Sequence, residues 1–173
     1  MLRLIASFGS ILLIGLACGC GNNVDHASAV KVMSSALTGT VAADGQLVSV
    51  TLNPAGGHVE ATLNNLVGTG TATVTGTVTH NGNLTTTNVD VTFKDWSDPV
   101  AHVTLNGALH EAGTFSSPLP LAGDVELTGA LAATGDVNAT VDFDLHGKYS
   151  LSGFSVTGSV GGQSLIDVQV SAK

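Results

Sequence analysis

Alternation of apolar and polar residues is the feature that most constrains what this chain can fold into. In VDVTFK, residues 89–94, and in VDFDLH, residues 141–146, every second residue is Val, Phe or Leu. A period of two is typical of antiparallel strands that bury one face and expose the other. Turn sequences separate such segments, at residues 43–45, 53–57, 80–83, 98–99, 134–136 and 161–162. Among them, Asn81-Gly82 is the strongest hairpin signal.

The pattern from Leu37 onward predicts an all-β domain, residues 37–173. We expect an antiparallel up-and-down meander of about nine to eleven strands that curls into a closed or partly open barrel. A two-sheet β-sandwich is the alternative. A membrane-spanning barrel is disfavoured because it needs aromatic girdles, whereas Trp96 and Tyr149 are the only Trp and Tyr of the chain.

The charge balance excludes several classes of partner. The net charge is −8, with only 5 basic residues, so neither nucleic acid nor an anionic lipid surface is an expected partner. Apolar residues make up 43% of the chain, which is not the composition of a disordered protein. No residue pattern calls for a cofactor.

The first 20 residues have the layout of a secretory signal. Arg3 precedes an apolar stretch, residues 11–17, and small residues follow it. The stretch is too short to span a bilayer as a helix, which takes about 20 apolar residues. Cys18 and Cys20 end the segment. They have neither the C-x-x-C spacing of a redox pair nor the second pair that a zinc site needs.

This segment resembles a bacterial lipoprotein signal peptide, in which a cysteine after small residues is acylated and becomes the first residue. Cys20, preceded by Ala17, Cys18 and Gly19, is our first choice for the lipidated residue, and Cys18 is the alternative. The resemblance implies a diacylglyceryl group and an N-acyl chain such as palmitate, and hence anchoring in the cell envelope. Because glycine follows either cysteine, it also implies the outer membrane in a Gram-negative cell.

Residues 21–36 are expected to be a tether between the signal and the β domain. They could form a short helix that Asp25 caps, or they could stay extended.

A glycine recurs at the centre of five similar segments with the pattern apolar, small polar, glycine, small, apolar: Gly39, Gly76, Gly107, Gly129 and Gly158. In strands, each glycine shares a face with its apolar neighbours and leaves a gap there. Such glycines either bend the sheet, which is the favoured interpretation, or line a groove for a ligand.

Other candidate sites are sparse. Asp142, Asp144 and His146 share one strand face and are the nearest approach to a metal-ligand set. Successive ligands on one strand lie about 7 Å apart, so a neighbouring strand would have to contribute. The remaining polar candidates are the pair His58 and Glu60, the group His102, His110 and Glu111, and the alternating threonines from Thr69 to Thr79. None forms a catalytic motif.

The leading functional hypothesis is a lipid-anchored, non-enzymatic protein whose β domain binds a small apolar ligand or a lipid. One alternative is a structural or adhesive envelope protein that acts through its sheet surface, with another envelope protein among its possible partners. A second alternative is a metal-dependent hydrolase.

Overall fold

The computed structural model describes residues 24–50, 56–116, 122–150 and 153–170. These residues form one helix and eight strands: α1 (His26–Val50), β1 (Gly57–Asn64), β2 (Thr71–Asn81), β3 (Leu84–Asp98), β4 (Val103–Ser116), β5 (Ala122–Gly135), β6 (Ala139–Ser150), β7 (Gly153–Val160) and β8 (Gln163–Val170). The strands make a single sheet in chain order, and each is antiparallel to the next. The predicted antiparallel meander is confirmed.

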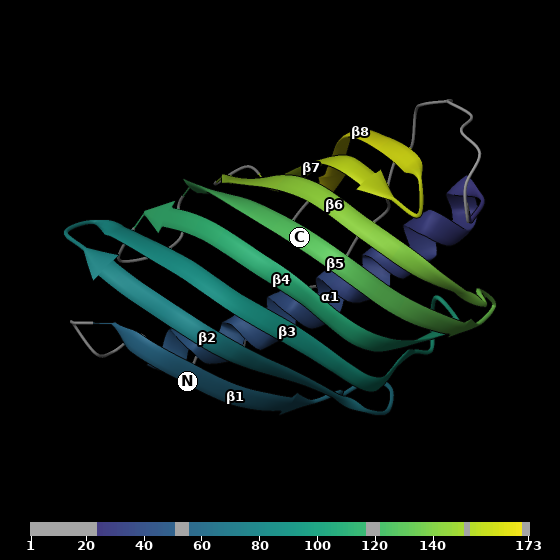
Figure 1. The fold of residues 1–173 in the computed structure, drawn as a ribbon, viewed down its shortest axis with the longest axis horizontal. Coiled ribbons are helices and arrows are strands. Elements are labelled where there is room, and N and C mark those ends of the chain that lie inside the picture. Colours follow the sequence, from purple (N-terminus) through teal and green to yellow (C-terminus); the bar gives the residue numbers. More distant parts are fainter. Residues whose placement is uncertain (1–23, 51–55, 117–121, 151–152, 171–173) are drawn as a thin grey trace.

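The sheet is strongly curled but does not close. β1 and β8 are its two edges and do not pair with each other, so the architecture is that of a partly open barrel, with no second sheet among the described residues (Figure 1). The described residues hold eight strands rather than nine to eleven, since α1 takes up residues in which we expected strands and several strands are long. β3 alone has 15 residues.

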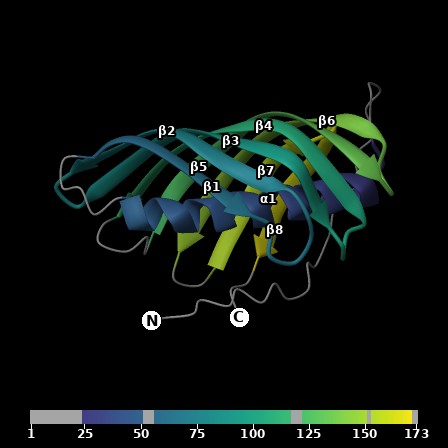
Figure 2. The same ribbon diagram turned by 90° about the horizontal axis from the view of Figure 1, so that it is seen from below.

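Helix α1 lies across the concave face of the sheet, and Figure 2 shows the strands arching over it. The prediction that strands begin at residue 37 is wrong, as is the predicted turn at residues 43–45, because the helix continues to Val50. Its buried side chains recur at spacings of three and four, which is the helical period. They are Ala29, Val32, Met33, Ser35, Ala36, Leu37, Thr40 and Ala43.

The core lies between this helical stripe and the inner face of the sheet, which is the face toward α1. Inner-face residues such as Leu105, Leu109 and Leu131 are at most 1% exposed. The helix passes close to the sheet at Gly39, where an added Cβ would collide with the ring of Phe93. Phe93 and Trp96 pack edge to face with their ring centroids 6.0 Å apart. A side chain at position 39 would therefore push the helix away from β3.

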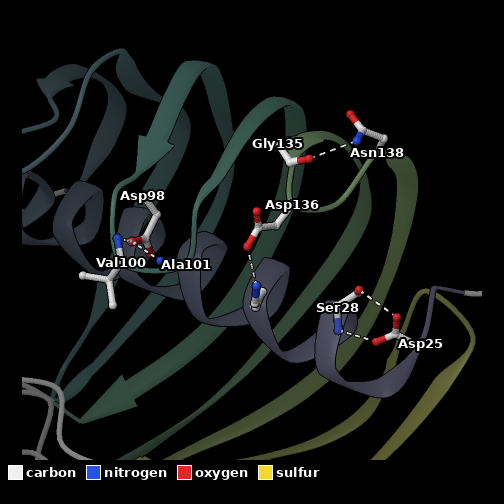
Figure 3. Close-up of polar contacts among 9 residues, drawn as sticks. Asp25, Ser28, Asp98, Val100, Ala101, Gly135, Asp136 and Asn138 are labelled. Atoms are coloured by element: carbon white, nitrogen blue, oxygen red, sulfur yellow. Dashed lines mark hydrogen bonds and ion pairs between the residues drawn. The ribbon is translucent and has the colours of Figure 1, made fainter.

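Polar contacts fix the helix at one end of the sheet (Figure 3). Of the two alternatives that the sequence left open, the helix forms, and Asp25 caps it by accepting a 2.8 Å hydrogen bond from the Ser28 N–H. That bond is the main reason why the pKa of Asp25 lies below its ordinary value. Farther along, the Lys31 ammonium lies 2.7 Å from the Asp136 carboxylate in the β5–β6 loop. The hydrogen bond from Lys31 lowers the pKa of Asp136.

Asp98, the last residue of β3, makes the most buried of these contacts. Its Oδ2 accepts a 2.7 Å hydrogen bond from the Ser35 hydroxyl of the helix. Its Oδ1 accepts hydrogen bonds from the backbone N–H groups of Val100 and Ala101. Burial raises the pKa of Asp98, but these three hydrogen bonds outweigh burial, and the pKa lies below its ordinary value.

Two tight hairpins follow the predicted turn sequences. Gly82 and Asn83 connect β2 to β3, with a φ of 60° at Gly82, as a type II′ turn requires at its first position. Gly161 and Gly162 connect β7 to β8 with φ values of 55° and 77°, the conformation of a type I′ turn. In the part of the chain that the structure describes, no helix is long and apolar enough to span a membrane.

Candidate functional site

The inner face of the sheet, where one of the two sequence interpretations places a groove lined by glycines, is covered by α1 (Figure 2). Gly39 lies in the helix, and the other four lie in strands at positive φ. At these four, Gly76, Gly107, Gly129 and Gly158, an added Cβ would collide with a backbone carbonyl oxygen of the adjacent strand. Their close approach to neighbouring strands supports the interpretation that they bend the sheet.

A hollow of about 650 Å³ lies instead on the outer face, which is the face turned away from α1. It crosses β3 to β7 near the β2–β3, β4–β5 and β6–β7 connections, at the left end of the sheet in Figure 1. We call it the outer groove. The strand register arranges its outward side chains in two rows. One row is Thr86, Thr114, Asp124, Lys148 and Ser155, and the other is Asn88, Ala112, Glu126, His146 and Thr157.

The charged groups of the outer groove pair across β5 and β6. His146 Nδ1 lies 3.6 Å from Glu126 Oε1, and Lys148 Nζ lies 3.9 Å from Asp124 Oδ1. All four side chains are more than half exposed, so these pairs contribute little to stability. The rest of the lining comprises hydroxyl and amide side chains, the small residues Ala112, Gly113 and Gly147, and the apolar Val125. The site therefore offers exposed hydrogen-bonding groups in an open trough.

The predicted metal candidates lie on the outer face of β6, and only His146 lines the outer groove. Asp144 Oδ1 lies 3.9 Å from His146 Nε2. Asp142 pairs in register with Ala130, which offers no ligand. No three His, Cys, Asp or Glu side chains among the described residues are placed to hold a metal ion together. The hydrolase hypothesis needed His146 to meet a second His or acid across strands, and Glu126 of β5 does lie beside it, but the two are not part of a three-ligand set among the described residues.

The other histidines and acids that the sequence singled out are dispersed. His58 and Glu60 are exposed on β1, an edge strand, and His102 lies in the β3–β4 loop with a φ of 55°. His110 Nδ1 is 2.9 Å from Asp90 Oδ1 on the outer face. Its neighbour Glu111 points to the opposite face, where it is buried and accepts a 3.3 Å hydrogen bond from the Thr87 hydroxyl.

The alternating threonines of β2 stand on the outer face beside only a few threonines of adjacent strands. Thr73 meets Thr62 of β1, with the two hydroxyl oxygens 3.1 Å apart, and Thr92 of β3 is its other partner. At Thr75 and Thr77 the partners on β3 are Asp90 and Asn88. The run is therefore part of a mixed polar face rather than a regular threonine array.

Most residues of the outer groove were not predicted, because their association depends on strand register. Thr86, Thr114, Asp124, Glu126 and Lys148 are unremarkable within their own strands. Only His146 was a candidate, and for a different chemistry. The two candidate lipidation sites, Cys18 and Cys20, lie outside the described residues. No family model, curated protein or solved structure matches the chain.

Proposed function

We propose that this chain is a non-enzymatic envelope protein, lipid-anchored through Cys20 or alternatively Cys18, which holds a neutral, hydroxyl-rich chain such as a glycan strand in its outer groove. The observation that carries the proposal is the pair of polar rows that run side by side across five strands.

The dimensions and the chemistry of the outer groove support a chain-like ligand. Neighbouring strands lie about 4.8 Å apart, so five strands give a trough about 19 Å long. Hydroxyl, amide and carboxylate groups line it, and they match the donors and acceptors of sugar hydroxyls. The net charge of −8 disfavours an anionic polymer.

The filled inner face supports a ligand on the outside of the sheet. A small apolar ligand, which the sequence favoured, would need the apolar space that Val32, Met33 and Ala36 of α1 occupy. Native mass spectrometry of the purified protein discriminates between the two. We expect the mass of the acylated chain alone, whereas a retained apolar molecule would favour the carrier hypothesis.

Co-sedimentation with insoluble cell-wall glycan tests the outer groove. We expect the Glu126→Ala/His146→Ala double variant to lose most of its binding, because two adjacent groups of one row are removed. Asp90→Ala/His110→Ala is the matched control, since it removes an exposed carboxylate–imidazole pair from the same face outside the groove. Equal binding by the two double variants would refute the proposed ligand site.

Metabolic labelling with a fatty-acid analogue tests the anchor. We expect Cys20→Ala to lose the label and Cys18→Ala to keep it, and the reverse pattern would assign the alternative cysteine. If both single variants keep the label, the chain is not anchored as proposed.

A further inference from the structure

Exposed apolar side chains gather at one end of the sheet. Leu66 and Val67 in the β1–β2 loop are 90% and 76% exposed, and Val100 in the β3–β4 loop is 88% exposed. We call these three residues the apolar rim. Leu84 and Ile166, the other large apolar side chains found exposed in the described ranges, lie elsewhere, at the start of β3 and in β8.

Each loop of the apolar rim is held by an Asn or Asp side chain. In the first loop, Asn65 Oδ1 accepts hydrogen bonds of 3.1 and 3.0 Å from the N–H groups of Val67 and Gly68. In the second, Asp98 Oδ1 accepts hydrogen bonds of 2.8 and 3.0 Å from Val100 and Ala101. Figure 3 shows the second arrangement. The same local geometry therefore fixes an exposed valine two residues after the acceptor in both loops.

The two loops are also tied to each other through Ser97 of β3. The Asn65 amide donates a 2.7 Å hydrogen bond to the Ser97 carbonyl, and the Ser97 N–H donates a 2.9 Å bond to the Thr69 carbonyl. Since Ser97 directly precedes Asp98, the apolar rim belongs to one connected structure. Its side chains are presented to solvent by an ordered backbone, which lowers the entropy cost of binding a partner.

The N-terminal end of the described chain lies at this same end of the sheet. In the antiparallel order, the β1–β2, β3–β4, β5–β6 and β7–β8 connections share one end. Gln163, the first residue of β8, donates a 3.0 Å hydrogen bond to the Val24 carbonyl. Cys20 precedes Val24 by four residues, which span at most about 14 Å even when fully extended.

We propose that the apolar rim inserts into the interfacial layer of a lipid bilayer beside the acyl anchor, an inference that rests on the proposed lipidation. Side chains such as Leu and Val settle at the boundary between headgroups and acyl chains. Three acids of this end are already engaged by the helix, since Asp98 and Asp136 bind Ser35 and Lys31 and Asp25 caps it, whereas Asp95 of β3 is exposed. No cluster of cations adjoins the rim in the described residues, so a zwitterionic surface fits better than an anionic one.

This orientation points the outer groove away from the membrane. The groove residues lie near the opposite ends of the same strands, and β4 covers roughly 36 Å between Val103 and Thr114. Insertion of the rim would set the tilt of the domain, which an acyl anchor alone would leave free. The ligand site would then face the space beyond the bilayer.

Depth-dependent quenching on phosphatidylcholine vesicles tests the proposal with the full, acylated chain. An environment-sensitive fluorophore is attached at Val100→Cys, after the cysteine of the 18/20 pair that is not acylated has been replaced by alanine. We expect a blue shift and quenching by nitroxide lipids, strongest for nitroxides about 5–10 Å below the headgroup surface. The same fluorophore at Asn83→Cys, in the β2–β3 turn at the opposite end, should show neither effect.

A second set of variants separates the rim from the anchor. Leu66→Ser/Val67→Ser should abolish the quenching at position 100, whereas Leu84→Ser, at the opposite end, should leave it unchanged. A vesicle-bound protein whose label at position 100 is unquenched would overturn the rim inference and leave the anchor intact. Failure of the acylation-competent chain to remain on vesicles would instead overturn the proposed anchor, and with it the rim inference.

Discussion

Replacement of Gly76 by alanine should destabilise the protein more than replacement of Gly57, although the two glycines have nearly the same φ. Their φ values are 153° and 150°. An added Cβ at Gly57 meets nothing within 4 Å, whereas at Gly76 it would lie 2.6 Å from Val89 Cα and collide with the Asn88 carbonyl oxygen. The pair therefore separates backbone strain from steric overlap with the adjacent strand.

The magnitudes follow from these two costs. A side chain forced into this backbone region costs about 1–3 kcal/mol in either variant. Overlap with backbone that cannot move cheaply adds about 1–3 kcal/mol, in Gly76→Ala only. For a chain of this length each kcal/mol lowers Tm by about 2–4 °C, so the two variants should differ by several degrees.

Urea denaturation and thermal unfolding of the purified full-length variants provide the measurement. The emission of Trp96, the single tryptophan, reports on the core because the side chain is only 4% exposed. Equal free energies of unfolding for the two variants, to within about 0.5 kcal/mol, would refute the argument that close strand approach requires glycine at position 76.

Three further predictions concern the attachment of α1 to the sheet. Because the pKa of Asp98 is lowered on folding, its contribution to stability is present above its ordinary value of 3.8 and lost as the pH falls through the folded pKa. Asp98→Asn should therefore flatten the acid limb of a stability–pH profile, and an unchanged limb would contradict this role. Met33→Ala should lower the free energy of unfolding by about 2–5 kcal/mol, because Met33 is fully buried under the sheet. A loss under 1 kcal/mol, read from the urea midpoint, would argue against tight docking of the helix. Lys31→Ala should change the stability by less than about 1 kcal/mol, since its ion pair with Asp136 is 41% and 50% exposed. A larger loss in the same urea assay would show that the pair does more than an exposed ion pair can.

The strands could be predicted from the sequence because the two faces of a strand are encoded in local alternation, as in residues 89–94 and 141–146. The second half of α1 could not, because Thr38, Gly39, Thr40 and Val41 have poor helix propensity and imitate the strand segments. Their helical state depends on tertiary packing of the buried stripe against a sheet that is made later in the chain. The stripe itself, with Val32, Met33 and Ala36, was a readable signal at helical spacing.

The outer groove could not be predicted from the sequence, for a different reason. Residues such as Thr86, Asp124 and Lys148 come from three strands, and only the register of the folded sheet places them in one row. The apolar rim could not be predicted for the same reason. Leu66 and Val100 are 34 positions apart in the sequence. They lie at the same end of the sheet because of the strand order. A single strand carries the signal for its own two faces, but not for its neighbours.

The position of α1 has a consequence for the order of events during biogenesis. The helix is synthesised before any strand, yet it contacts β1 to β4 and β7, and Val24, two residues before the helix, adjoins the start of β8. Its apolar stripe therefore has no complete surface to pack against until almost the whole chain has been synthesised. If the chain is exported as proposed, we expect the nascent helix to depend on protection by an export chaperone, and truncation within the last two strands to remove its contacts with β7. The helix is thus the first element to be synthesised and the last to complete its packing.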